Sequence, residues 1–122
     1  MSRGHVTITI PWDALASFNQ RNQRKGGKAH SYDYKRSLQT IRMIAQGAVQ
    51  GQRPKWPDGA VYMEISFVPP DRRRRDVTNL LKGLMDALEG VVYADDFQVD
   101  ELHIQRLDAD KHDARAEVRV LG

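Results

Sequence analysis

Hydrophobic and polar residues alternate over several stretches of the chain, which predicts strands that each bury one face. The clearest stretch is 61–68, and the same pattern spans residues 5–10 and 115–121. A further strand is expected over residues 97–107. The turn-forming sequence at 108–113 separates it from the last strand, so we expect these two strands to form an antiparallel hairpin.

Two segments, residues 33–50 and 77–90, carry apolar residues at helical spacing. Residues 12–30 are polar and basic, and they are expected to form a surface loop or a flexible arm that folds onto a DNA backbone. The order strand, helix, strand, helix, strand, strand predicts a small α/β (α+β-like) fold, with a mixed sheet of about four strands and two main helices. With 122 residues, the chain is expected to be a single domain over residues 1–122.

The helix expected at residues 77–90 separates an apolar side from a polar side. One stripe is apolar and is expected to face the sheet: Val77, Leu80, Leu81, Leu84, Leu88 and Val91. Asn79, Lys82 and Asp86 gather on the opposite side. A lysine and a carboxylate four residues apart can simply pair on a solvated surface, so this polar side alone does not establish a functional site.

The distribution of charged residues along the chain is more informative than the net charge. The net charge is +3 and the isoelectric point is about 9.4, which is a weak indicator of nucleic-acid binding. Two clusters hold many of the basic residues: Arg21, Arg24, Lys25 and Lys28, and then Arg72, Arg73, Arg74 and Arg75. The absence of cysteine excludes disulfides, zinc–thiolate sites and thiol catalysis. No apolar run matches a signal peptide or a membrane span, so we expect a soluble cytoplasmic protein with no membrane partner.

Acidic residues lie close to the second basic cluster. Asp76 follows the four arginines directly, and Asp95–Asp96 lie just beyond the expected helix. Arginine binds phosphates, and closely spaced carboxylates favour a divalent cation such as Mg²⁺. Together these groups suit cleavage of a nucleic acid backbone, where substrate and metal meet at one phosphate. Each element also has a structural interpretation: Asp76 as a helix N-cap, Asp95–Asp96 as a turn, and the arginines as a solvated edge.

The segment 69–104, PPDRRRRDVTNLLKGLMDALEGVVYADDFQVDELHI, resembles the RusA-type Holliday junction resolvases, which are crossover junction endodeoxyribonucleases. The shared pattern is a basic stretch, Asp, Asn, Lys, a further Asp, an Asp-Asp pair and a Gln. The resemblance implies a RusA-like fold and a homodimeric, Mg²⁺-dependent endonuclease that places paired nicks across four-way DNA junctions in recombination and repair. It also implies one or two Mg²⁺ ions, for which Mn²⁺ can substitute, no small-molecule cofactor, and a bacterial or phage origin.

Position by position, the resemblance assigns catalytic roles to Asp76, Lys82 and Asp96. Asp76 and Asp96 are the expected metal ligands, with Asp86 or Asp95 completing the site. The expected DNA-binding residues are Arg72, Arg73, Arg74, Arg75, Asn79, Lys25 and Lys28.

The chain departs from the family pattern at Thr78, where the best-known members carry a second aspartate. We expect Asp86 or Asp95 to compensate, because Asp86 shares a helix face with Asn79 and Lys82. Alternatives stay open beside the resolvase: a junction-binding protein of the same fold with impaired cleavage, a metal-dependent nuclease acting on flaps, forks or RNA, and a purely structural or protein-binding role.

Overall fold

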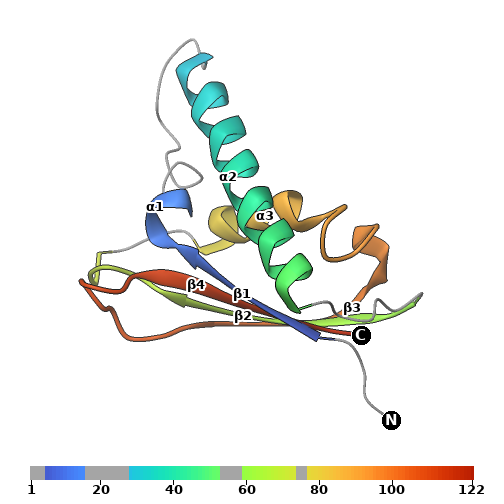
Figure 1. Ribbon diagram of the computed structural model, residues 1–122. Helices are drawn as coiled ribbons and strands as arrows, with labels where there is room; N and C mark the ends of the chain where they lie inside the picture. The colour runs from blue at the N-terminus through green and yellow to red at the C-terminus, as the bar shows by residue number, and fades with distance from the viewer. Residues whose placement is uncertain (1–4, 16–27, 53–58, 74–76) are drawn as a thin grey trace.

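The computed structural model describes residues 5–15, 28–52, 59–73 and 77–122, without the side chains of residues 28–33 and 96. Its elements, in chain order, are β1 (His5–Pro11), α1 (Trp12–Leu15), α2 (Lys28–Gln52), β2 (Val61–Val68), α3 (Val77–Leu88), the 3-10 helix η2 (Asp96–Gln98), β3 (Val99–Arg106) and β4 (Arg115–Leu121) (Figure 1). Within this described part of the chain, no helix combines the length and the apolar content needed to cross a membrane.

The four strands form one mixed sheet in the order β1-β4-β2-β3. β4 pairs antiparallel with both β1 and β2, whereas β3 pairs parallel with β2. A small α/β fold with a four-stranded mixed sheet was predicted from the sequence pattern, and the structure confirms it.

The predicted hairpin between β3 and β4 is wrong, because β4 lies between β1 and β2. The intervening loop crosses the end of β2: Leu107 N–H donates to Phe67 O and Asp110 N–H to Pro69 O, both over 2.8 Å. Burial explains the strand order. β4 carries a buried apolar row that suits the middle of a sheet, whereas β3 is exposed along almost its whole length and suits an edge.

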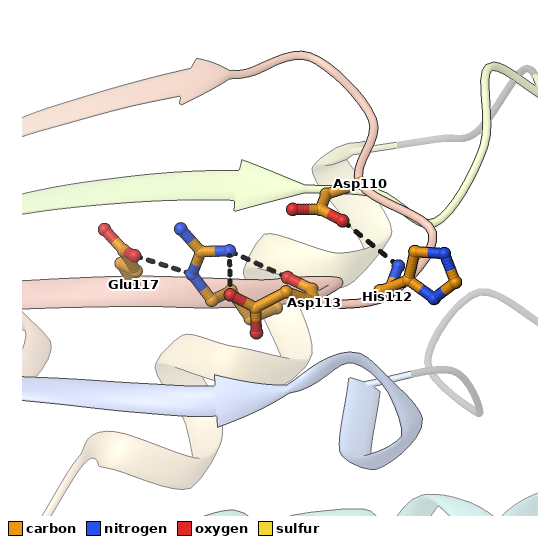
Figure 2. A network of polar contacts seen from close by, with 5 residues as sticks. Asp110, His112, Asp113 and Glu117 are labelled. Atoms are coloured by element: carbon orange, nitrogen blue, oxygen red, sulfur yellow. Dashed lines mark hydrogen bonds and ion pairs between the residues drawn. The ribbon is translucent and has the colours of Figure 1, made fainter.

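Arg115 fixes the end of this loop where β4 begins. Its Nε donates to Glu117 Oε2 over 2.6 Å, and its Nη1 donates to Asp113 O and Oδ2 over 2.7 and 2.9 Å. Figure 2 shows the two carboxylates on either side of the guanidinium group. The hydrogen bond to Glu117 is the main cause that raises the pKa of Arg115 above its ordinary value.

The core lies on one face of the sheet, under the helices, which Figure 1 shows on the same side of the strands. The register places apolar residues of neighbouring strands together on this face, with Ile8 opposite Val118 and Val118 opposite Ile65. The buried side chains of α2 and α3 pack against them: Ile41, Ala45, Leu80, Leu84, Ala87 and Leu88. The other face is polar, and Arg119 Nη1 lies 3.6 Å from Glu64 Oε1 there.

α3 ends at Leu88, and the chain reverses its direction through Gly90, whose φ is +88°. The Gly90 N–H donates to Tyr93 O over 2.7 Å, and the N–H groups of Val91 and Val92 both donate to Leu88 O over 3.0 Å. A left-handed conformation is available to glycine without the steric conflict that a Cβ creates. The turn that follows α3 therefore depends on the backbone freedom of this one residue.

We predict that Gly90→Ala lowers the free energy of unfolding by about 1–2 kcal/mol, the cost of holding an L-residue in a left-handed conformation. A Cβ at Gly90 would meet no atom within 4 Å, so the loss would come from the backbone alone. Gly47→Ala is the matched control, because Gly47 lies within α2 with equally open surroundings, and it should gain about 0.5–1 kcal/mol. Urea unfolding measures both, and effects of the same sign would contradict this explanation.

Candidate functional site

α3 runs antiparallel to β2, and its two ends lie at opposite ends of that strand. Near the start of the helix, Val77 and Leu80 line a small hollow together with Phe67 and Pro69, at the C-terminal end of β2. Beyond the other end of the helix, the segment 90–94 lines a pocket with Val61, the first residue of β2. The helix therefore runs from one end of the sheet to the other, and predicted site residues lie near both of these ends.

The predicted division of α3 into an apolar and a polar side is confirmed. Leu80, Leu84 and Leu88 are buried against the sheet, whereas Lys82 and Thr78 are exposed. The Lys82 ammonium group can therefore approach a ligand from solvent. Thr78 is also accessible, but its hydroxyl brings no charge.

Asp86 is tied to α2. Its Oδ2 accepts a hydrogen bond from the Tyr34 hydroxyl over 2.8 Å. Arg42, also from α2, donates to the backbone carbonyl oxygens of Asp86 and Ala87 over 3.1 and 3.2 Å. These carbonyl groups end α3 and have no acceptor role inside the helix, so Arg42 caps the C-terminus of the helix. The polar side that the sequence predicted is thus divided: Lys82 faces solvent and Asp86 binds a neighbouring helix.

The Asp95–Asp96 pair lies in a turn that is organised by Gln98. Gln98 Oε1 accepts the N–H groups of Ala94 and Asp95 over 2.8 and 3.1 Å. Gln98 Nε2 donates to Gly59 O over 3.1 Å, just before β2 begins. Asp95 itself is exposed, and its Oδ1 accepts the N–H of Phe97 over 3.0 Å. One amide side chain therefore fixes the acidic turn to the start of β2.

Sequence reasoning gave no structural role to Gln98 or to Arg42. The signal for Gln98 was present, because an amide two residues after an Asp-Asp turn can accept the free N–H groups of that turn. Arg42 was one of several cations on a predicted helix, and its partners lie more than forty residues away along the chain. No local pattern could single it out.

The described arginines lie beyond the C-terminal end of β2. Arg72 and Arg73 are exposed, and the Arg73 N–H donates to Asp71 Oδ1 over 2.9 Å. Several predicted site residues lie outside the described residues: Lys25, Arg74, Arg75 and Asp76, and the side chains of Lys28 and Asp96. Their roles stay predictions.

The described neighbours of the two predicted catalytic aspartates lie near opposite ends of α3. Asp76 precedes Val77, the first residue of the helix, and Asp96 begins η2 beyond the other end. A helix of 12 residues is about 18 Å long at 1.5 Å per residue. Oxygen ligands of a Mg²⁺ ion lie about 2.1 Å from it, so the ligands of one ion lie much closer to one another than the two ends of this helix do.

The described acidic residues agree with this separation. Among the residues that the structure describes, no group of three acidic or histidine side chains is arranged to hold a metal ion. Asp86 and Asp95, the two predicted ligands with described side chains, thus form no such group with a described third residue. Carboxylates suit Mg²⁺ chemically, but a complete set is not assembled by the described side chains of one chain.

Comparison with known proteins identifies the family of this chain. The model of the endodeoxyribonuclease RusA family matches residues 11–121, which is almost the whole chain. No curated protein sequence matches it. The chain therefore belongs to the RusA endodeoxyribonuclease family. It is a hydrolytic enzyme, an endodeoxyribonuclease that resolves Holliday junctions, and nucleases of this kind generally depend on a divalent metal ion.

We predict that Gln98→Leu opens the acidic turn. The substitution keeps the approximate size of the side chain but leaves the N–H groups of Ala94 and Asp95 without their side-chain acceptor. Because both hydrogen bonds are exposed, we expect each to contribute about 0.5–1.5 kcal/mol. Amide hydrogen exchange followed by NMR should accelerate at these two groups. Gln105→Leu is the control, since Gln105 makes one exposed hydrogen bond to Ser66. Unchanged exchange at Ala94 and Asp95 would show that Gln98 does not hold the turn.

Tyr34 provides a prediction for alkaline pH. Burial, followed by the hydrogen bond and the charge of Asp86, raises the pKa of Tyr34 from 10.0 to about 12. A group whose pKa is higher in the folded state stabilises the fold below its unfolded pKa, and this contribution is lost as pH rises through the folded value. We expect the free energy of unfolding to fall between pH 10 and about 12 in the native chain and less in Tyr34→Phe. Urea titrations at several pH values would show equal losses if Tyr34 were not involved.

Proposed function

We propose that this protein resolves four-way DNA junctions as a Mg²⁺-dependent homodimer, placing paired nicks on opposing strands in recombination and repair, with Mn²⁺ able to replace Mg²⁺. The observation that supports the proposal is the placement of charged residues around α3: exposed Arg72 and Arg73 before it, exposed Lys82 on it and the acidic turn after it.

The proposed ligands of the ion are Asp76 and Asp96. Because Val77, which follows Asp76 in the sequence, and Asp95, which precedes Asp96, lie near opposite ends of α3, we infer that each site combines Asp96 of one copy with the partner's Asp76. Asp95 is the better candidate for completing the site, since it is exposed beside Asp96, whereas Asp86 is half-buried and already accepts the Tyr34 hydroxyl. When bound, Mg²⁺ polarises the scissile phosphate and lowers the pKa of a coordinated water.

The remaining groups act on the phosphate and on the duplex arms. Lys82 neutralises the charge that develops on the phosphate in the transition state, which is possible because its side chain is exposed. Arg72 to Arg75, together with Lys25 and Lys28, bind backbone phosphates and make the affinity for DNA depend on salt. Asn79, half-buried one turn before Lys82, is the proposed polar contact next to the scissile phosphate.

Replacement of Lys82 by methionine should separate catalysis from binding. We expect turnover of a four-way junction with a mobile core to fall at least about 100-fold, as for loss of a group that stabilises the transition state. The dissociation constant for the junction should change by less than about threefold, because one phosphate contact contributes little to the total affinity. Lys35→Met, which removes an exposed lysine from α2, should change neither quantity.

The same assay distinguishes the alternatives. Symmetric nicks that require Mg²⁺, stop in EDTA and disappear in Asp96→Asn would support the resolvase. Junction binding without nicks would indicate a binding protein whose metal site fails at Thr78. Faster cleavage of flaps, forks or RNA than of junctions would indicate a different nuclease. Indifference of Arg72 and Arg73 variants to every nucleic acid would favour a structural role.

A further inference from the structure

β3 exposes apolar side chains to an unusual degree. The described residues include five exposed large hydrophobic side chains, and four of them lie on β3 or beside it: Phe97, Leu102, Ile104 and Leu107. Phe97 is 90% exposed, although it stands directly beside the acidic turn. Leu102 and Ile104 pair with Met63 and Ile65 of β2, so they extend the apolar face of the sheet beyond the cover of the helices.

The two outer edges of the sheet differ. At β1, the side-chain amide of Gln52 occupies the outward backbone groups of Thr7, because Thr7 N–H donates to Gln52 Oε1 over 2.8 Å and Gln52 Nε2 donates to Thr7 O over 2.6 Å. At β3, no strand among the described residues pairs with the side that faces away from β2. An edge that is long, partly apolar and open is suited to pairing with another strand.

We propose that β3 pairs antiparallel with β3 of a second copy of this chain, about a two-fold axis at His103. In this register Leu102 lies opposite the partner's Ile104, and Asp100 lies opposite the partner's Arg106. Apolar residues and opposite charges therefore meet directly, and both kinds of cross-strand pair are stabilising. Because β3 is acidic at its start and basic at its end, its charges match only when the two strands run in opposite directions.

This contact also brings the two halves of the proposed site together, a consequence that rests on the proposed function. In an antiparallel pair, the acidic turn before β3 lies at the same end of the joint sheet as the C-terminal end of the partner's β2. The partner's Arg72 and Arg73 follow that strand, and the partner's Asp76 comes three residues later in the sequence. Val99 and the partner's Val99 are about 27 Å apart at 3.4 Å per residue, so the two sites stand at opposite ends of the interface.

The absence of cysteine from the chain makes the register directly testable. In the proposed interface, His103 faces the partner's His103 with Cα atoms about 4.5–5.5 Å apart, which is within the range of a disulfide. His103→Cys should therefore form a covalent dimer on mild oxidation, seen by non-reducing electrophoresis. His103 is exposed, and its 3.5 Å contact to Glu101 lies on the surface, so the substitution leaves the core untouched.

Glu101→Cys and Gln105→Cys are matched controls on the same face of the strand. In the proposed register, Glu101 lies opposite the partner's Gln105, and each residue lies about 14 Å from the same residue of the partner. Neither single variant should therefore cross-link alone. An equal mixture of the two variants should cross-link. Comparable cross-linking at all three positions, or none at His103, would overturn the proposed register.

The oligomeric state tests the contact independently of DNA and metal. Sedimentation equilibrium should show a dimer for the native chain. Ile104→Lys should raise the dimer dissociation constant at least about 10-fold, because it places a charge opposite the partner's Leu102. Met43→Lys, at an exposed apolar position on α2, should leave the constant unchanged. A native chain that stays monomeric, or equal effects of the two variants, would overturn the proposal.

Junction cleavage is measured separately, so the two proposals can fail separately. A chain that nicks junctions but does not cross-link at His103→Cys would retain the proposed function and lose the β3 interface. A chain that cross-links as expected but cuts no junction would retain the interface and lose the proposed function.

Discussion

Because β2 and β3 run parallel, the chain must cross the sheet between them, and α3 makes that crossing. The direction of β2 places the described arginines at one end of the sheet, and the start of β3 places the acidic turn at the other. The apolar side of α3 packs on the strands, which leaves Lys82 exposed on the opposite side. The placement of Lys82, the described arginines and the acidic turn relative to one another therefore follows from this one pairing.

Much of the fold was predictable because local patterns determine it. Strict alternation of apolar residues predicted β2 over the residues that it occupies, and helical spacing predicted the buried stripe of α3. The position of β3 was not predictable in this way. The sequence at 108–113 is typical of a turn, but the choice between a hairpin and a parallel edge strand depends on which strand the core requires in its centre. The buried row of β4 decides that choice, and it involves contacts with both β1 and β2.

The candidate site was predictable as a list of residues but not as an arrangement. Spacing along one helix correctly separated exposed Lys82 from the core, yet it grouped Asp86 with Lys82, although Asp86 meets Tyr34 of α2. A helical wheel reports direction around an axis and contains no information about neighbouring helices. Likewise, Gln98 acts across the fold through Gly59, a contact that no local pattern contains.

The amide of Gln52 at Thr7 has a consequence for stoichiometry. A sheet with two open edges can add further chains at each end and grow into a fibre, whereas a sheet with one occupied edge can grow only from the other. A two-fold contact uses the same surface on both chains and leaves none of that surface for a third. The Gln52 amide occupies the N–H and C=O groups of Thr7, so a further strand could not pair with β1 in full register, which favours a closed pair of chains over a growing sheet.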